Sequence, residues 1–283
     1  MNNVSLSIET GEIVGFLGPN GAGKSTFMKI LTGFIEPSFG SAKVAGYEIG
    51  KDSLEIRKRV GYLPEHNPLY LDMYVKEYLA FIGGLYGVKD LKNRIQEVID
   101  MVGLQKEQHK KLGALSKGYR QRAGLAHAII HDPEVLILDE PTTGLDPNQL
   151  DEIRKLIFHL GQQKTVLLST HIMQEVEAIC NRIIIINNGE IVANQNAKEL
   201  MAEKQKMVVN VEFATRFSGG FQSLENFKQV EKISDTHFLI EFEGANDPRE
   251  SIFHFAVENK TPLVGLSMER RNLEEVFKEL TAK

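Results

Sequence analysis

The stretch that decides the fold is Gly18-Pro19-Asn20-Gly21-Ala22-Gly23-Lys24-Ser25-Thr26, a glycine-rich loop that ends in Lys, Ser and Thr. The apolar run Ile13–Leu17 precedes it, and Phe27–Leu31, which has helical apolar spacing, follows it. A strand, such a loop and a helix in this order form the P-loop layout, in which backbone N–H groups and the helix N-terminus bind phosphate groups. We expect Lys24 to reach the β- and γ-phosphates and the Ser25 hydroxyl to ligate Mg²⁺. The loop therefore predicts a nucleoside triphosphate site, and by itself it leaves a kinase, a GTPase, a helicase and a transporter ATPase open.

Composition narrows the class of protein. The chain has 283 residues and a net charge of −5, so nothing in it favours a duplex nucleic acid as partner. No apolar run approaches the roughly 18 residues that a membrane span needs, and the first residues lack the basic start and apolar stretch of a secretory signal. The single cysteine, Cys180, excludes an internal disulfide and fits a reducing cytosol.

Short apolar runs alternate with segments of helical spacing over residues 1–203. Strands are expected at Val4–Ile8, Ile13–Leu17, Ala42–Val44, Val60–Leu63, Val135–Leu138, Thr165–Ser169 and Arg182–Ile186. Helices are expected from the P-loop to Gly33 and at Lys117–Ile130, Pro147–Leu160 and Ile172–Cys180. Residues 66–125 carry helical spacing, at Tyr74–Tyr86 and Leu91–Val102, and read as a helical insertion. This alternation predicts an α/β domain with a largely parallel sheet.

Residues 204–283 have a different pattern. A polar, helical segment, Asn194–Lys206, marks the boundary before them. The expected elements are a strand at Met207–Phe213, a helix at Phe217–Phe227, paired strands at Val230–Ile233 and His237–Glu243, a helix at Pro248–Asn259, a strand at Leu263–Ser267 and a final helix at Leu273–Leu280. Their β-α-β-β-α-β order predicts a small α+β module of the ferredoxin-like type.

Two carboxylates end an apolar run at Val135–Pro141. Parallel strands of an α/β sheet present their carboxyl ends to ligands, so Asp139 and Glu140 are expected at the nucleotide edge. Asp139 would hold Mg²⁺, and Glu140 would act as general base on the attacking water. Taken alone, the stretch is explained as well by a buried strand that ends in a solvated acidic turn.

Two further stretches carry weaker signals. Ser116 precedes a helix and suits its N-cap, with Gly118 in the first turn, where an anion can bind. Without other motifs, such a serine is usually a cap and nothing more. His171 ends a strand, from which it could contact the γ-phosphate or orient water, although a lone histidine is usually structural.

Taken together, these stretches resemble those of the ATP-binding-cassette (ABC) ATPases over about residues 2–200. The matching stretches occur in the family's order: Gly18–Thr26, Leu115–Gln121, Leu138–Pro141, Gly144–Asp146 and Ser169–His171. The resemblance implies ATP and Mg²⁺ as cofactors and a head-to-tail homodimer, or a pairing with a related ATPase subunit, that sandwiches two nucleotides. It further implies catalysis by Glu140 and His171 and closure of the site by Ser116, Gly118 and Asp146.

The resemblance also implies a partner. Tyr62–Glu65 would link the core to the helical insertion, in a region where transporters of this family receive a short helix from an integral-membrane permease subunit. The chain would then be the motor of an exporter at the cytoplasmic face of the inner membrane, with no nucleic acid as partner. The rival is a soluble ATPase of the same family acting on nucleic acid or ribosomes. Such proteins usually carry a long coiled coil, zinc-binding cysteines or two ATPase domains.

A narrower resemblance rests on Gly61–Tyr70, Leu115–Arg122 and His171–Val176. These stretches are similar to those of ATP-binding subunits associated with bacterial gliding motility, in the drug- and polysaccharide-export branch. The C-terminal module fits that branch as well.

The chain departs from the family pattern at three places. Glu65 stands where most members have Gln, and we expect its carboxylate on the metal side of the site. Lys117 and Tyr119 replace the usual Gly and Gln, while Ser116 and Gly118 are kept. Members usually have some two dozen residues before the strand equivalent to Val4–Ile8, including a strand and an aromatic residue that stacks on adenine. Neither element is present here, so we expect either a misassigned or truncated start or a domain that lacks an edge strand and a base clamp. Because stacking on one aromatic residue contributes roughly 1–3 kcal/mol, we expect this polypeptide to bind ATP weakly.

Overall fold

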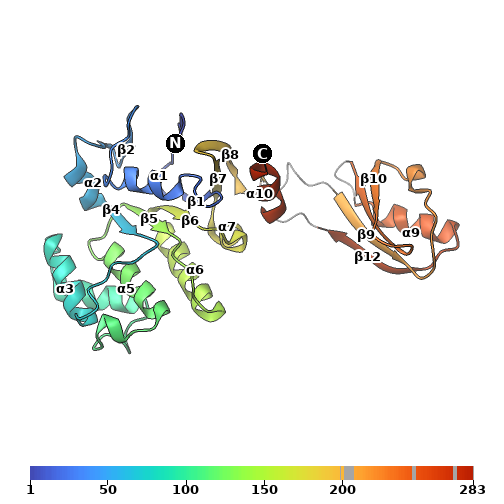
Figure 1. The fold of residues 1–283 in the computed structure, drawn as a ribbon. Helices are drawn as coiled ribbons and strands as arrows, with labels where there is room; N and C mark the ends of the chain where they lie inside the picture. The colour runs from blue at the N-terminus through green and yellow to red at the C-terminus, as the bar shows by residue number, and fades with distance from the viewer. Residues whose placement is uncertain (198, 201–206, 244–246, 270–272, 283) are drawn as a thin grey trace. The chain divides into compact units, whose positions relative to one another are not determined.

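The computed structural model describes residues 1–197, 199–200, 207–243, 247–269 and 273–282 (Figure 1). The chain divides into two compact units, residues 1–197 with 280–283 and residues 198–279. Among the described residues, no helix has the length and hydropathy that a membrane crossing requires.

A six-stranded sheet forms the centre of the first unit. Its order is β4-β5-β6-β1-β7-β8, and every pairing is parallel except that of β7 with β8. The bounds are β1 Ile13–Leu17, β4 Val60–Leu63, β5 Val135–Asp139, β6 Thr165–Ser169, β7 Arg182–Asn187 and β8 Glu190–Asn196. The α/β class and the five parallel strands are confirmed, because each strand is an apolar run buried on both faces.

Helices cover this sheet and form the insertion. Those of the core are α1 Lys24–Leu31, α2 Ser53–Arg59, α6 Pro147–Gly161 and α7 Met173–Ile179. Those of the insertion are α3 Val75–Leu85, α4 Leu91–Met101, a 3₁₀ turn at Leu112–Ala114 and α5 Lys117–Ile129. A small hairpin, β2 Lys43–Val44 with β3 Tyr47–Glu48, lies near α2 in Figure 1.

The insertion is fixed to the sheet by a close approach of α5 to β4. Gly61 in β4 makes this approach possible, because a Cβ at that position would collide with the carbonyl oxygen of Ala128 in α5. The loop that leaves β4 is thereby held between the sheet and the insertion. Phe16 of β1 and Phe27 of α1 stack at 4.7 Å in the core beside it, which anchors the helix of the P-loop.

Val4–Ile8 is not a strand, contrary to the sequence prediction. Its side chains alternate between half-buried and exposed as expected, and Val4, Leu6 and Ile8 pack on the core. A cavity of about 530 Å³ lies between this segment and Ser41–Ala45. The structure gives this segment no backbone hydrogen bond to a described strand, so it is not part of a sheet.

The polar segment Asn194–Lys206 is likewise not a single helix. Asn194–Asn196 complete β8, where side chains alternate between exposed and half-buried, while Ala197, Glu199 and Leu200 are helical. Residues 198 and 201–206 lie outside the described part of the chain. The strand was missed because an edge strand has one solvated face, and its polar residues resemble a linker.

The second unit is α+β, as predicted. Its sheet has the order β10-β11-β9-β12 with every pairing antiparallel. The elements are β9 Met207–Phe213, a 3₁₀ turn at Phe221–Ser223, β10 Phe227–Lys232, β11 His237–Phe242, α9 Arg249–Glu258 and β12 Leu263–Glu269, and the chain's last helix is α10 Leu273–Thr281.

The helix predicted at Phe217–Phe227 is wrong, so the β-α-β-β-α-β order lacks its first helix. Gly219 and Gly220 have φ values of +112° and +111°, which a right-handed helix does not contain. Phe217 and Phe221 instead pack with Phe255 in an aromatic cluster that fills the core of this unit. The gain in buried aromatic area stabilises a folded loop in place of the helix.

Candidate functional site

The P-loop joins β1 to α1 through left-handed glycines. Gly21 and Gly23 have φ values of +80° and +111°, conformations that side chains other than glycine disfavour. A Cβ at Gly18 would collide with the carbonyl oxygen of Ile186, so the loop runs close to β7. Gly23 is the N-cap of α1 and offers no capping side chain. The first N–H groups of the helix therefore remain available to an anion.

Lys24 lies over the loop and is only 8% exposed. Its Nζ donates hydrogen bonds to the carbonyl oxygens of Gly18 at 2.6 Å and Pro19 at 3.2 Å. A buried ammonium group held only by neutral carbonyls gains strongly from an anionic partner. Lys24 is thus placed to turn from the loop backbone to a phosphate oxygen.

A cavity of about 540 Å³ opens beside the loop. Its lining residues come from four segments that are far apart in the sequence: the P-loop with the start of α1, the loop after β4, the end of β5 with the turn that follows it, and the loop after β6. The lining residues are Asn20, Gly21, Gly23, Lys24, Ser25, Thr26, Glu65, Asp139, Glu140, Thr143 and His171. Gly18, Pro19 and Ala22 belong to the loop but do not line the cavity.

The two carboxylates at the end of β5 face different partners. Asp139 is 3% exposed, and its Oδ1 accepts a hydrogen bond from Ser169 Oγ at 2.5 Å. The backbone N–H of Glu140 donates to the same Ser169 Oγ at 3.1 Å. Ser169, at the end of β6, therefore locks the turn that follows β5, and Glu140 takes a left-handed φ of +50° there.

Glu140 is held by two donors on one oxygen. Its Oε2 accepts from Thr143 Oγ1 at 3.1 Å and lies 2.8 Å from His171 Nδ1. With the carboxylate ionised, the histidine donates through Nδ1, and its Nε2 is the ring atom left for a phosphate or a water. The structure gives Oε1 no hydrogen bond within the described residues. Oε1 is therefore the atom that can accept a proton.

Burial raises the pKa of the Glu140 carboxyl above its usual value, and the positive field and hydrogen bond of His171 oppose that rise. If Glu140 is the general base, it must be ionised, and ATP turnover should then fall as the pH drops through this raised pKa. His171→Ala removes the opposing contribution and is expected to move the acid limb of the kcat profile to higher pH. Thr143→Val should move it the same way by less. An acid limb that stays in place in both variants would contradict this assignment.

Ser116, Gly118 and Asp146 do not line this cavity. Ser116 caps α5, with its Oγ accepting from Tyr119 N at 3.4 Å, and Asp146 caps α6, with its Oδ1 accepting from Gln149 N at 3.0 Å. A Cβ at Gly118 would collide with the amide of Gln149, so the first turns of α5 and α6 lie against each other. Ser116 and Asp146 are exposed and Gly118 is buried, and within one chain all three lie outside the nucleotide cavity.

The cavity suits a hard cation. Ser25, Glu65 and Asp139 offer oxygen donors within it. No group of three or more His, Cys, Asp or Glu side chains in the described residues is arranged to hold a metal alone. Mg²⁺ needs no such group, because it is usually bound by one or two carboxylates with phosphate oxygens and waters.

The sequence did not reveal the roles of Ser169 and Thr143. Ser169 lies in the stretch Ser169–His171, and Thr143 lies between the stretches Leu138–Pro141 and Gly144–Asp146. Neither residue type indicates from the sequence which side chain it will contact. Ser169 contacts Asp139 across two neighbouring strands, and only the parallel register of β5 and β6 brings them together.

The family model described as "ABC transporter" matches residues 1–143. The NatA ATP-binding protein of Bacillus subtilis is 38% identical over 78% of this chain and 91% of its own length. The linearmycin resistance ATP-binding protein LnrL of Bacillus subtilis is 32% identical over the whole chain and 94% of its length. The bacitracin transport ATP-binding protein BcrA of Bacillus licheniformis is 39% identical over 68% of this chain and 63% of its length.

The fold has solved neighbours as well. A dimeric ATP-binding cassette, MJ0796, in a post-hydrolysis state with ADP and phosphate, aligns with a TM-score of 0.63 at 26% identity. The alignment covers 69% of this chain and 89% of the cassette. The chain therefore belongs to the ABC transporter family as an ATP-binding subunit. It binds ATP, and its hydrolysis of ATP is coupled to transport through a membrane permease component.

Proposed function

We propose that the chain is the motor subunit of an exporter, in which ATP closes a head-to-tail dimer and hydrolysis reopens it. The observation that carries the proposal is the pairing of Glu140 with His171 in the cavity of the P-loop. The names of BcrA and LnrL, a bacitracin transport and a linearmycin resistance protein, support the export branch.

Each residue has a part in the reaction. Lys24 and the loop N–H groups bind the β- and γ-phosphates, and Glu140 Oε1 accepts the proton of the attacking water. His171 holds Glu140 through Nδ1 and offers Nε2 to the γ-phosphate or the water. Mg²⁺, held by Ser25 and Asp139 with Glu65 beside them, would supply positive charge to the phosphate oxygens.

The position of Ser116, Gly118 and Asp146 outside the nucleotide cavity of their own chain supports the dimer. Ser116 and Asp146 cap α5 and α6, whose N-termini favour an anion, and Gly118 lies in the first turn of α5. None of the three lines the cavity of its own chain. In a head-to-tail dimer, Ser116 and Gly118 of a second copy would meet the phosphates bound by the first. Asp146 would lie beside them.

The permease would be an integral-membrane subunit, and the ATPase would sit at the cytoplasmic face of the inner membrane. The short helix of the permease would dock near Tyr62–Glu65. Purification with a co-expressed polytopic membrane protein, and ATPase activity stimulated by it, would support this function. Activity that responds instead to nucleic acid or ribosomes would favour the soluble ATPase. The net charge of −5 gives no support to a nucleic-acid partner.

A role in gliding motility rests only on the resemblance of Gly61–Tyr70, Leu115–Arg122 and His171–Val176. The relatives described above carry names from drug export and resistance. Deletion of the gene, followed by a motility assay, would test the role in gliding motility. Its result would not affect the assignment of ATPase activity.

Glu65→Gln is expected to raise the Mg²⁺ concentration needed for half-maximal nucleotide binding by severalfold. The substitution removes one negative charge from the metal side of the cavity, where a full charge contact is worth up to about 4 kcal/mol at intermediate dielectric. A Mg²⁺ titration of fluorescent ATP analogue binding measures the effect, with the exposed Glu190→Gln as control. An unchanged titration would place Glu65 away from the metal.

A further inference from the structure

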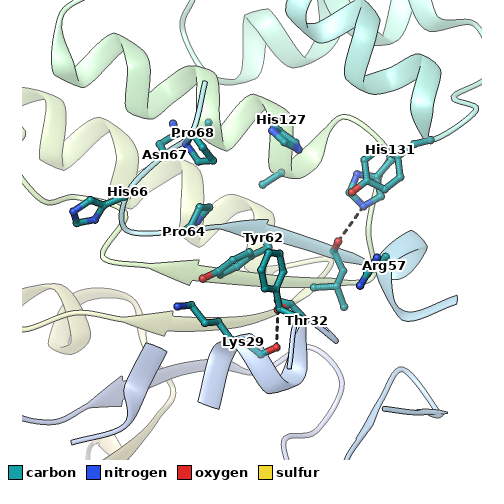
Figure 2. Close-up of a pocket in the computed structure, with 15 residues that line it drawn as sticks. Lys29, Thr32, Arg57, Tyr62, Pro64, His66, Asn67, Pro68, His127 and His131 are labelled. Carbon is teal, nitrogen blue, oxygen red and sulfur yellow. Dashed lines mark hydrogen bonds between the residues drawn. The ribbon is translucent and has the colours of Figure 1, made fainter. Parts of the chain in front are cut away.

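The ring of His171 is not held in the nucleotide cavity by packing. Its side chain is 62% exposed, and no aromatic ring among the described residues stacks on it. His131, which lines a different cavity (Figure 2), is held in the opposite way. It stacks on Tyr86 with the ring centroids 3.9 Å apart, and its Nε2 is hydrogen-bonded to the carbonyl oxygen of Val60 at 3.2 Å. The position of His171 therefore depends on its bond to Glu140 and on the backbone that carries it.

The Thr170 hydroxyl fixes the backbone on both sides of His171. Thr170 is fully buried, and its Oγ1 accepts a hydrogen bond from the backbone N–H of Ile172 at 3.1 Å. The same hydroxyl donates its proton to Glu175 Oε2 at 2.8 Å. Ile172 is the N-cap of α7 and has no capping side chain, so Thr170 joins the end of β6 to the start of this helix. The backbone that carries His171 is thus tied through Thr170 to Glu175.

Glu175 is a buried carboxylate that packing does not explain. It lies on α7 and is 1% exposed. Its Oε1 is buried and has no hydrogen-bond partner in the described part of the chain. The helix packs so closely on β1 that a Cβ at Gly15 would collide with Val176. Because a carboxylate loses its hydration in such a place, an apolar side chain would pack there at lower cost. The carboxylate therefore needs a role besides packing.

An ionised carboxylate differs from other side-chain acceptors because it only accepts hydrogen bonds. The single proton of the Thr170 hydroxyl is therefore committed to Glu175, and a lone pair of Oγ1 remains for the N–H of Ile172. Glu175→Gln would bring an amide that can donate to Oγ1, which frees the hydroxyl to rotate. A bond to a charged acceptor is also roughly twice as strong as one between neutral groups. The carboxylate thus fixes the orientation of the hydroxyl.

The contacts of this segment lead to the carboxylate assigned as general base. Ser169 Oγ accepts from the backbone N–H of Glu140, and His171 Nδ1 lies 2.8 Å from Glu140 Oε2. Thr170, between these two residues, makes its contact with Glu175 instead. Because hydrogen bonds weaken steeply when their geometry is lost, a displacement of the backbone at His171 would weaken its contact with Glu140.

We propose that Glu175 is a positioning residue for ATP hydrolysis, which acts through Thr170 to fix the backbone of His171 and hold its ring against Glu140. The inference rests on the proposed function and adds to it a buried support that does not line the nucleotide cavity. Loss of this support slows turnover and leaves nucleotide binding intact, since the P-loop and Lys24 are unchanged.

Single substitutions test the two ends of this support. Glu175→Gln is expected to lower kcat about tenfold and to leave both KM for ATP and the affinity for a fluorescent ATP analogue unchanged. Thr170→Val, which removes the hydroxyl, should show the same pattern. Thr170→Ser, which keeps the hydroxyl, should hydrolyse ATP at close to the normal rate. Gln174→Ala is the matched control, because Gln174 is exposed on the same helix.

A double-mutant cycle tests whether Glu175 acts through His171. His171→Ala is expected to lower kcat by more than Glu175→Gln does, and adding Glu175→Gln to it should cause no further loss. Thr143→Val alters a contact of Glu140 that does not pass through His171, so in that background Glu175→Gln should cause its full loss. Single-turnover phosphate release measures the slow rates of the double variants.

Other results would overturn the positioning role. They are a normal kcat in Glu175→Gln or Thr170→Val, loss of ATP binding or of the folded state in both variants, and losses that multiply in the His171→Ala background. The proposed function can fail separately. Normal hydrolysis by His171→Ala would remove the catalytic assignment of His171, and the positioning role with it. Slow hydrolysis by His171→Ala with normal hydrolysis by Glu175→Gln would remove the positioning role alone.

Discussion

Glu140→Gln is expected to lower ATP turnover by about 10²–10⁴-fold, the range for loss of a general base. Glutamine keeps the size of the side chain and can still accept from Thr143 and His171, but it cannot take a proton at the atom that Oε1 occupies. The measurement is steady-state phosphate release, with Glu190→Gln as an exposed control. Hydrolysis at the normal rate would show that another group activates the water.

The same variant should accumulate the state before hydrolysis. If ATP closes the dimer and hydrolysis opens it, Glu140→Gln with ATP and Mg²⁺ elutes as a dimer, and with ADP as a monomer. Adding Ser116→Arg should prevent the dimer, because a large side chain replaces the one expected against the second nucleotide. A monomer under every condition would contradict the head-to-tail arrangement. Elution does not test the role of Glu140 as general base, so phosphate release is measured on the same samples.

The central sheet was predictable because its strands are buried on both faces. Val135–Asp139 and Arg182–Asn187 are short apolar runs between helical segments, the pattern of parallel strands that are covered by helices on both faces. The edges were not predictable in the same way. β8 has one solvated face, and Val4–Ile8 has the alternation of a strand but no neighbour with which to pair. Strand formation depends on a partner that local sequence does not reveal.

In the candidate site too, residues that are contiguous in the sequence were predictable, and contacts between distant residues were not. The P-loop is contiguous, so its residues and their order were available from the sequence. Ser169, which holds both Asp139 and Glu140, is 30 residues from the former along the chain, and its role depends on the register of two strands.

Lys24→Ala is expected to weaken ATP binding by about 100-fold, since each charge-assisted hydrogen bond to phosphate contributes roughly 1.5–3 kcal/mol. The loss should decrease from ATP to ADP and be small for AMP, because Lys24 is assigned to the β- and γ-phosphates. Lys29→Ala is the matched control: it lies on the same helix, five residues further along, and does not line the nucleotide cavity.

The expected loss is smaller than the full strength of the contacts because Lys24 is not free before ATP binds. Its Nζ already donates to the carbonyl oxygens of Gly18 and Pro19, and these bonds are exchanged for bonds to phosphate. Lys24→Met keeps an unbranched apolar side chain and removes only the charge, so it measures the contribution of the ammonium group apart from that of side-chain packing. Equal losses for AMP and ATP in both variants would mean that Lys24 shapes the loop rather than binds the phosphates.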